Sequence, residues 1–401
     1  MAQTPKLWSV NFLLLCTANL CMTMSFYLLM PVLPFFLKDD RGMGGAAAGT
    51  IISAYMLGSL LIRPLTGYAL DRWGRRGVFI GSFFVFALTA GSYPLLSGFA
   101  GIFVVRFLHG LFWGSSLTAG QTVAVDIIPK ARRGEGVGIY TFFMSAAMAL
   151  GPALGIKIYG INGANTVFLL SMTIGLIGVG LTLPLKLPKF ESRPIALKWE
   201  NFFEGSVLPV GLAAFMFTVV YGGLVNYVAY FAAQMQTHSL DAAWFYVVLA
   251  AGMGFARLKG GKLFDKQGPR RVALYAFTML VIGLLSLWGC AHVPWHWLAV
   301  FAFYGASFLI GLGCGFCMPV YQTMVSLMVP MSRLGVANAT YASVFELGIA
   351  TGIIATGALS QVMGLDWIYF LSALWLVFSG VVFFRFVVAR YDRQRLAAQD
   401  V

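Results

Sequence analysis

The fold of this chain is decided by a stretch that occurs twice, RPLTGYALDRWGRR at residues 63–76 and RLKGGKLFDKQGPR at residues 257–270. The two copies share two arginines, an aspartate and a glycine at the same spacing. A second pair of related stretches follows, FLHGLFWGSSLTAGQT at 107–122 and FLIGLGCGFCMPVYQT at 308–323. The offsets are 194 and 201 residues, close to half of the 401-residue length. The chain therefore consists of two related halves.

The composition is that of a membrane protein, because 59% of the residues are hydrophobic and only 10% are charged, against roughly a quarter charged in soluble proteins. Runs of about 20 residues or more, long enough to cross the hydrocarbon layer, occur twelve times. They lie at 9–37, 46–70, 77–98, 101–126, 135–159, 164–187, 207–233, 241–260, 272–291, 296–328, 335–361 and 365–389. The first run is too long for a signal peptide, so we expect a retained span. The predicted fold class is an all-α membrane protein with 12 transmembrane helices in two pseudosymmetric six-helix bundles, an arrangement typical of transporters.

The longest polar stretch between spans divides the chain. We predict an N-terminal six-helix bundle at 1–187, a cytoplasmic linker at 188–206, a C-terminal six-helix bundle at 207–390 and a cytoplasmic tail at 391–401. Every other connection is short, which leaves no room for a soluble domain.

The net charge of +13 indicates how the chain is oriented. With both termini in the cytoplasm, Lys38, Arg41 and Lys157 are the only cations at the outer face, and the loop cations fall at the inner face. This asymmetry follows the positive-inside rule. It indicates a multi-pass membrane protein with membrane lipid as a partner, and it argues against nucleic acid. We expect the cytoplasmic (inner) membrane of a bacterium.

Cysteine and histidine give little sign of metal or enzyme chemistry. The pair Cys314-x-x-Cys317 resembles a redox or metal motif but lacks a second pair, and packing is the simpler reading. Three of the four histidines, His238, His292 and His296, are expected at the outer surface, where they assemble no catalytic set. We therefore expect no disulfide, no metal, no cofactor and no enzyme.

The loop after the second span contains GYALDRWGRR at 67–76. Its glycines allow a tight turn and close helix approach, and Asp71 can accept hydrogen bonds from a helix N-terminus or an arginine. The stretch resembles the loop signature of the major facilitator superfamily, and GKLFDKQGPRR at 261–271 is its weaker second copy. The twelve-span resemblance covers the whole chain, and it points to the drug–proton antiporter branch.

The resemblance implies that this loop is an inner gate, which holds the two halves together when the transporter faces outward. Asp126, at the inner end of span four, is a candidate partner for one of the loop arginines. The alternative is a basic loop that fixes topology, with a helix-capping aspartate. The residues assigned to gating are Gly67, Asp71, Arg72, Gly74, Arg75, Asp126 and Asp265.

Arg106-x₃-Gly110-x₃-Gly114 in span four is similar to a second family signature, which is associated with proton-coupled members. An arginine in hydrocarbon costs at least about 2.5–3.5 kcal/mol on insertion scales, so it should face a wet cavity or a partner. We assign Arg106 and the neighbouring His109 to proton coupling. The alternatives are an arginine that snorkels to the surface and a buried, hydrogen-bonded imidazole.

Ala147-x₃-Gly151-Pro152-x₂-Gly155 in span five resembles the signature of the exporter (antiporter) branch. Ala147 and Ile156 replace two of its glycines, so the match is partial. Gly151, Pro152 and Gly155 are the residues assigned to this motif. The alternative is ordinary close packing of small residues.

Glu346, in span eleven, is the carboxylate expected near the middle of the membrane. The equivalent position in the first half is Ser145, so the duplicated scaffold does not require the charge. Our hypothesis is that Glu346 couples proton movement to substrate movement. The alternative is a structural ion pair with an intramembrane arginine.

In the family, spans one, four, seven and ten line the central cavity. Arg63 and Arg257 are pseudosymmetric and could line the inner vestibule or snorkel to the headgroups. The other cavity residues offered are Asn19, Tyr27, Trp113, Tyr221, Asn226, Tyr227, Tyr304 and Gln322. This mixture favours an amphipathic ligand over a sugar, although any one aromatic residue is more often packing.

The leading hypothesis is a proton-coupled exporter of small amphipathic molecules that works by alternating access. Arg63, Arg106 and Arg257 stand against Glu346 alone, so we expect a neutral, zwitterionic or anionic substrate. The alternatives are an exporter dedicated to one metabolite, such as a sugar or an opine-type metallophore, and a lipid flippase. An intramembrane enzyme or a sensor fits least. We expect protons as the coupling partner and a monomer.

Overall fold

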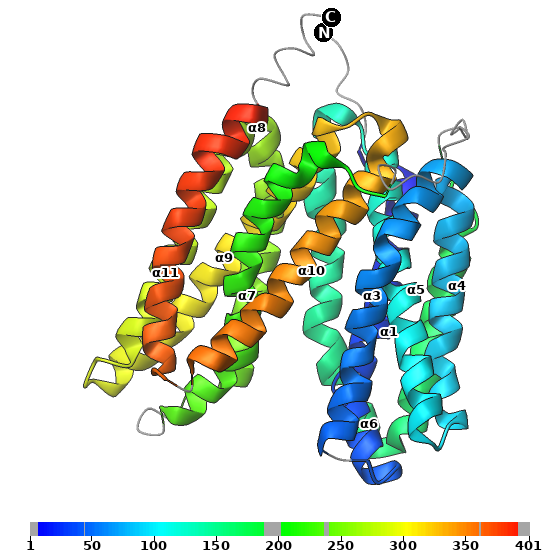
Figure 1. Cartoon of the computed structure of the whole chain (residues 1–401), viewed down its shortest axis with the longest axis horizontal. Coiled ribbons are helices and arrows are strands. Elements are labelled where there is room, and N and C mark those ends of the chain that lie inside the picture. Colours follow the sequence, from blue (N-terminus) through cyan, green and yellow to red (C-terminus); the bar gives the residue numbers. More distant parts are fainter. Residues whose placement is uncertain (1–6, 44, 188–201, 236–239, 361, 392–401) are drawn as a thin grey trace, which may run out of the picture. The chain divides into compact units, whose positions relative to one another are not determined.

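The structure is a computed structural model that describes residues 7–43, 45–187, 202–235, 240–360 and 362–391. Within these ranges the regular structure is entirely helical (Figure 1). The elements in chain order are α1 (Val10–Leu29), α2 (Val32–Phe35), η1 (Phe36–Asp40), α3 (Gly45–Trp73), α4 (Arg75–Ser92), η2 (Tyr93–Leu95), α5 (Phe99–Ile127), η3 (Lys130–Arg132), α6 (Arg133–Thr182), η5 (Gly205–Val207), α7 (Leu208–Gln234), α8 (Ala242–Cys290), α9 (His296–Met328), η7 (Met331–Arg333), α10 (Leu334–Leu359), α11 (Leu365–Val382) and η8 (Phe383–Val388).

Two of these elements are too long to be single spans. The helix α6 has 50 residues and α8 has 49, whereas about 20 residues cross the hydrocarbon layer. Each is interrupted by one glycine with non-helical dihedrals, Gly163 at φ 75° and Gly268 at φ 76°. Such positive φ values are readily adopted only by glycine. These two glycines therefore divide α6 and α8 into two spans each.

The membrane fold predicted from the sequence is confirmed. Nine segments of the described residues are long and apolar enough to cross a membrane, and the one at Trp244–Cys290 holds both halves of α8. Each of the predicted runs falls on a helix or on half of a divided helix. The first span is α1, α2 and η1 together, Val10–Asp40, interrupted near Pro31, which has no N–H to donate.

Glycines allow α3 and α5 to pack with their backbones in contact. A methyl group at Gly58 would overlap the carbonyl oxygen of Phe107, and one at Gly110 would overlap that of Tyr55. Lipid tails are as apolar as the helices, so association within a bilayer depends on such close packing more than on hydrophobic burial. Gly110, in the repeated stretch at 107–122, thus allows the close approach of α5 to α3.

The same contact recurs between α8 and α9 in the second half. A methyl group at Gly252 would lie 2.6 Å from the Phe308 carbonyl oxygen, and one at Gly311 would overlap that of Leu249. These positions correspond to the first set at the offsets of 194 and 201 residues. The duplicated sequence therefore encodes a duplicated helix pair.

The described helices form two compact units. The first comprises Met1–Lys130, Phe143–Glu204 and Pro330–Thr340, and the second comprises Ala131–Phe142, Gly205–Val329 and Tyr341–Val401. Two helices therefore change units along their length. The helix α6 begins in the second unit and continues in the first, whereas α10 begins in the first and continues in the second. The predicted bundle boundaries stay a prediction, and 188–201 of the linker and 392–401 of the tail lie outside the described residues.

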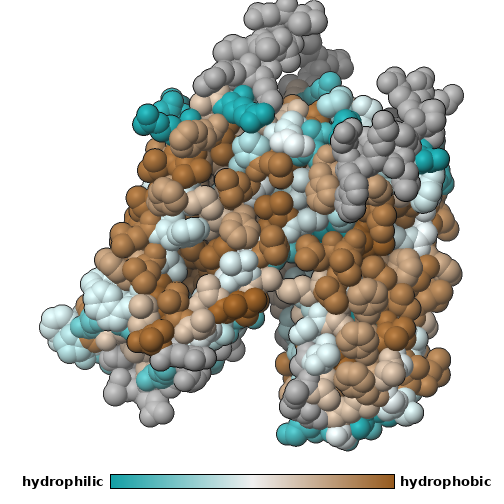
Figure 2. Space-filling view, in the orientation of Figure 1, coloured by the Kyte–Doolittle hydropathy of each residue, from teal (hydrophilic) through white to brown (hydrophobic). Residues whose placement is uncertain are grey.

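The outer faces of the helices are as apolar as their contacts. In α3, for example, Leu57, Leu61 and Leu65 follow one another at helical spacing with more than half of each side chain exposed. Figure 2 shows such apolar residues along the helices and hydrophilic residues toward their ends. A soluble protein does not expose stripes of this kind, and a lipid-facing helix does.

The close packing of α3 against α5 is testable with one methyl group. Gly110→Ala should destabilise the protein by about 1–3 kcal/mol, the usual cost of overpacking a tight contact, because the new methyl meets the backbone of Tyr55. Unfolding of purified protein in mixed detergent micelles would measure this. Gly81→Ala, in α4, is the matched control, since no atom lies within 4 Å of its new methyl group. Equal stability of both variants would contradict the packing argument.

Candidate functional site: a clamped helix start and buried cations

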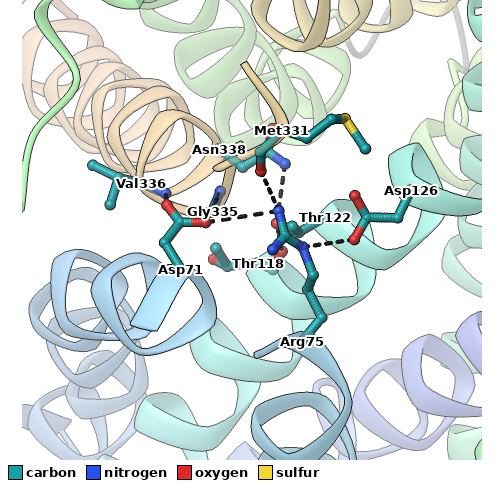
Figure 3. A network of polar contacts seen from close by, with 9 residues as sticks. All are labelled: Asp71, Arg75, Thr118, Thr122, Asp126, Met331, Gly335, Val336 and Asn338. Atoms are coloured by element: carbon teal, nitrogen blue, oxygen red, sulfur yellow. Dashed lines mark hydrogen bonds and ion pairs between the residues drawn. The ribbon is translucent and has the colours of Figure 1, made fainter. Parts of the chain in front are cut away.

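Asp71, in the last turn of α3, holds the beginning of α10. Its two carboxylate oxygens accept hydrogen bonds from the backbone N–H groups of Gly335 (3.0 Å) and Val336 (2.9 Å), as Figure 3 shows. These N–H groups lie in the first turn of a helix and have no partner within it. The carboxylate also opposes the positive end of the helix dipole. The arrangement is a clamp on a helix start, and all of it belongs to the first unit.

Glycine makes this clamp sterically possible. A methyl group at Gly67 would lie 2.7 Å from the Ala339 Cβ, and one at Gly335 would lie 2.8 Å from the Asp71 carboxylate. Larger residues at either position would separate α3 from α10 and lengthen the carboxylate hydrogen bonds.

Arg75, the first residue of α4, joins the clamp to α5. Its Nε lies 2.6 Å from the Asp126 carboxylate, its Nη2 lies 3.8 Å from that of Asp71, and its guanidinium donates to the Met331 carbonyl oxygen (Figure 3). Gly74 at φ 93° turns the chain so that Arg75 points inward. The side chains of Arg75 and Asp126 are 3% and 5% exposed, so this is a dry ion pair.

Asp71 lies just beyond the predicted span 46–70, and its charge state follows from its surroundings. Desolvation by burial raises the pKa of the Asp71 carboxyl to about 6, against the lowering effects of the Val336 N–H and the Arg75 guanidinium. At neutral pH the group is therefore a carboxylate, which is the form that can accept both helix N–H groups.

A further polar contact in the same region was missed by sequence reasoning. The Asn338 amide donates to the Thr122 hydroxyl at 3.1 Å, and that hydroxyl donates to the Thr118 carbonyl oxygen at 2.9 Å (Figure 3). We call these contacts together the Asp71 network. Its members are Asp71, Arg75, Thr118, Thr122, Asp126, Met331, Gly335, Val336 and Asn338.

The second copy of the loop motif, at 261–271, forms an equivalent clamp in the second unit, but without a buried ion pair like that of Arg75 and Asp126. Asp265 accepts hydrogen bonds from the N–H groups of Gly134 and Glu135, both at 2.9 Å, at the beginning of α6. Pro269 occupies the position equivalent to Arg75. Instead, the Glu135 carboxylate pairs with Arg132 at 2.7 Å and with Lys262, a 61% exposed lysine, at 3.3 Å. The two clamps share their hydrogen bonds and differ in their charges.

Arg72, also assigned to gating, lies at the edge of this region. Its guanidinium donates to the Tyr68 hydroxyl and its Cζ lies 5.7 Å from the centre of that ring. The gating roles of Arg72 and of the other loop residues stay a prediction.

Two arginines are buried in the spans of the first unit. Arg63 donates to the hydroxyls of Thr118 at 3.0 Å and Ser59 at 3.5 Å. Arg106 faces the Met30 thioether at 3.4 Å, with its Cζ 4.6 Å from the centre of the Tyr55 ring. Both are 1% exposed. Neither reaches the surface, so the snorkelling alternative does not describe this structure.

His109 is enclosed by aromatic rings beside Arg106. Its Nδ1 lies 3.2 Å from the Tyr93 hydroxyl, and its ring stacks on Phe86 with centroids 4.8 Å apart. The geometry is that of a hydrogen-bonded, buried imidazole. Its assignment to proton coupling stays a prediction.

The second unit contains the counterpart of Arg63 and the central carboxylate. Arg257 donates to the Thr141 carbonyl oxygen at 2.6 Å and faces the Met318 thioether at 3.2 Å. Glu346 lies in the middle of α10 and is half-buried. Among the described residues, Glu346 is thus the carboxylate in the middle of a span, whereas Arg63, Arg106 and Arg257 are buried in spans.

The predicted cavity residues divide between the two units. Asn19 and Trp113 are buried and Tyr27 is half-buried in the first unit. In the second unit Gln322 is buried, and Asn226 is exposed and donates to the Gly222 carbonyl oxygen of its own helix. The predicted cavity tyrosines of the second unit are half-buried: Tyr221, Tyr227 and Tyr304. That they line one cavity stays a prediction.

The partial exporter motif packs α6 against α1. A methyl group at Gly151 would lie 2.6 Å from the Tyr27 Cβ, and one at Gly155 would overlap the Leu28 carbonyl oxygen. Pro152 lies within α6 between them. The geometry is close packing of small residues, which was the alternative interpretation of this motif. A role of the motif in export stays a prediction.

In the part of the chain that the structure describes, twelve helical spans, a duplicated helix clamp and charges buried within the spans are together typical of a membrane transport protein. The Major Facilitator Superfamily model matches residues 15–308 and 298–400. The chain therefore belongs to the major facilitator superfamily, and its resemblance to exporters of that family is confirmed.

Named relatives lie at low identity over nearly the whole chain. The chain is 23% identical to the staphylopine export protein of Staphylococcus aureus over 370 residues, 88% of this chain and 91% of that one. It is 25% identical to the multi-drug resistance efflux pump PmrA of Streptococcus pneumoniae over 398 residues, 93% and 94% of the two chains. The crystal structure of the human organic anion transporter MFSD10 has the same fold, with TM-score 0.76 at 16% identity over 93% of this chain and 98% of that one.

The dry ion pair of the first clamp predicts a large penalty for removing either partner. Arg75→Gln should destabilise the protein by about 3–5 kcal/mol, because it leaves Asp126 buried and uncompensated. The double variant Arg75→Gln, Asp126→Asn should lose less than the sum of the single variants, as contacting residues do. Unfolding in mixed micelles would measure all three.

Lys262→Gln is the matched control from the second clamp. The exposed lysine is expected to contribute less than about 1 kcal/mol. Additive losses for Arg75 and Asp126, or a loss at Lys262 as large as that at Arg75, would show that the two clamps do not differ as described.

Proposed function

We propose that this protein is a secondary active transporter that exports small amphipathic compounds in exchange for protons. Membership of the major facilitator superfamily supports transport. The export names of two relatives, the staphylopine export protein and the efflux pump PmrA, support the outward direction. The partial exporter motif at Gly151, Pro152 and Gly155 agrees with that direction.

The observation that carries proton coupling is the position of Glu346. Among the described residues it is the one carboxylate in the middle of a span, because the others lie at helix ends or in connections. Ionisable residues inside membrane spans mark proton and substrate pathways. Arg106 cannot give up its proton in a protein, so we propose that it acts on coupling through its charge and that Glu346 carries the proton.

The helix α10 links this carboxylate to the first clamp. Glu346 and the clamped N–H groups of Gly335 and Val336 belong to one continuous helix. Hydrogen bonds to a charged group contribute about 1.5–3 kcal/mol each, so the clamp holds the beginning of α10 firmly but not irreversibly. We propose that transport by alternating access releases and reforms the clamp, and that proton transfer at Glu346 biases this step.

The charges of the spans favour a neutral, zwitterionic or anionic substrate. Arg63, Arg106 and Arg257 are buried cations, and Glu346 alone opposes them. A permanent cation would have to be desolvated among spans whose buried charges are mostly positive, at a cost that opposite charges do not balance. A second candidate, an exporter dedicated to one metabolite, is favoured by the relative named staphylopine export protein.

We also propose the cellular setting. The two relatives with export names are bacterial proteins, and the distribution of lysine and arginine follows the positive-inside rule with both termini in the cytoplasm. The protein would then lie in the inner membrane of a bacterium, and we propose separately that it acts as a monomer.

Substitution of the central carboxylate tests the coupling. Glu346→Gln should abolish uptake into inside-out vesicles driven by an imposed pH gradient, because the amide cannot exchange a proton at neutral pH. Transport down a substrate gradient should persist. Asp366→Asn, at the start of α11, removes a carboxylate at a helix end and should leave pH-driven transport unchanged. Full pH-driven activity of Glu346→Gln would rule out the carrier role.

A panel of charged compounds tests the substrate class. Reconstituted vesicles with an imposed pH gradient should accumulate aromatic carboxylates or zwitterions at least about tenfold faster than a quaternary ammonium dye of similar size, since an unmatched buried charge costs several kcal/mol. Rapid, gradient-driven accumulation of the dye would overturn this part of the proposal. Empty vesicles provide the baseline for passive leakage.

A further inference from the structure

The guanidinium of Arg106 lies inside the first unit with most of its donors unused. The residue is 1% exposed, and its Nε and Nη1 atoms have no hydrogen-bond partner among the described residues. No described carboxylate lies within 4.0 Å of it. Buried charges in membrane spans normally have a partner. Arg106 therefore lacks the counter-charge that its position requires.

The neighbours of Arg106 supply no strong acceptor in the plane of the guanidinium. Tyr55 covers one face of the group, with its ring centre 4.6 Å from Cζ. The donors point outward within the plane, so a ring on the face does not use them. The Met30 thioether at 3.4 Å from Nη2 is a weak acceptor. The Tyr93 hydroxyl also interacts with the guanidinium, but it is uncharged and is shared with His109 Nδ1. A charged oxygen acceptor is the group that would satisfy these donors.

A second unused nitrogen lies on the same helix. His109 is fully buried, its Nδ1 contacts the Tyr93 hydroxyl at 3.2 Å, and its Nε2 has no hydrogen-bond partner among the described residues. Residues three apart share one face of a helix, so His109 and Arg106 belong to the same face of α5. Arg106 and His109 thus each have a nitrogen that has no hydrogen-bond partner among the described residues.

Aromatic side chains stand beside these nitrogens. Phe26 stacks on Trp113 with centroids 4.0 Å apart, and it contacts Tyr27 and Tyr55 with centroids 5.4 Å away. The rings of Tyr27 and Tyr55 are half-buried, and so is Met30, so an apolar group could reach them. The helix α1, which carries Phe26 and Tyr27, contains no acidic residue.

We propose that Arg106 binds the carboxylate of an organic anion, whose apolar body packs on Tyr27, Tyr55 and Met30. The substrate class is then amphipathic organic carboxylates. This inference rests on the proposed export function and narrows its substrate. Arg63, a second buried cation on α3, adds to the positive charge of the same unit.

Equilibrium binding without a pH gradient tests the proposal. Full-length protein in detergent micelles would be titrated calorimetrically with naphthalene-2-carboxylate, with the uncharged naphthalene-2-carboxamide and with the naphthylmethylammonium cation. The carboxylate should bind at least about tenfold more tightly than the carboxamide, as a charge-assisted contact implies, and the ammonium most weakly. Arg106→Gln should remove this preference. Lys157→Gln, which removes an exposed cation of the same unit, should retain it.

A second variant keeps the test decisive if Arg106→Gln does not fold. Arg106→Lys retains the charge without the planar donors, and it should weaken carboxylate binding about fivefold or more and leave carboxamide binding unchanged. Equal binding of carboxylate and carboxamide by the wild type, or carboxylate binding unchanged in Arg106→Lys, would overturn the proposal. Binding of dihexanoyl phosphatidic acid without binding of the naphthoate would also overturn it, in favour of a lipid headgroup. The binding measurements need no pH gradient, so their result does not depend on proton-coupled export. A failure of pH-driven export would therefore count against the proposed function and not against carboxylate binding by Arg106.

Discussion

The structure depends on two carboxylates that satisfy the beginnings of two helices. A helix start exposes N–H groups without partners, and inside a packed, apolar protein each unsatisfied group costs about 1–3 kcal/mol. Asp71 and Asp265 each accept two such N–H groups, at 2.9–3.0 Å. In both cases the clamped helix, α10 or α6, continues into the other compact unit. Each of these pairs of hydrogen bonds therefore holds the beginning of a helix that belongs to both units along its length.

Duplication retained these hydrogen bonds but not the charges around them. Arg75 adds a dry ion pair with Asp126 to the first clamp, and Pro269 makes the same bond impossible in the second. There Glu135 lies at the clamped helix start itself and pairs partly with an exposed lysine. A buried pair is screened little by salt, whereas an exposed one is screened strongly. We therefore expect the two clamps to differ in strength and in their sensitivity to ionic strength, although one repeated pattern underlies both.

The spans, the loop signature and the kind of partner that Asp71 would have could all be predicted from the sequence, because they follow from hydropathy and from residue chemistry. The identity of the helix that Asp71 clamps could not, since nothing local to Asp71 specifies a contact with Gly335, 264 residues away. A signal was nevertheless present: Arg132-x-Gly134 recurs as Arg333-x-Gly335 at the offset of 201 residues. It marks the two clamped helix starts. The Asn338–Thr122 hydrogen bond has no such signal, because the equivalent of Asn338 in the first half is Val137.

The buried arginines show how differently the same charge can be accommodated. Arg257 meets a backbone carbonyl oxygen and Arg63 meets two hydroxyls, so each has acceptors supplied by the protein. Arg106 meets a thioether, the face of a ring and the single hydroxyl of Tyr93, and its Nε and Nη1 atoms have no hydrogen-bond partner among the described residues. These contacts do not replace the hydration that a guanidinium loses on burial. A protein that only needed to fold would be more stable with an apolar residue there. The burial of an arginine at this cost is therefore best explained by a negative group that binds to it during function.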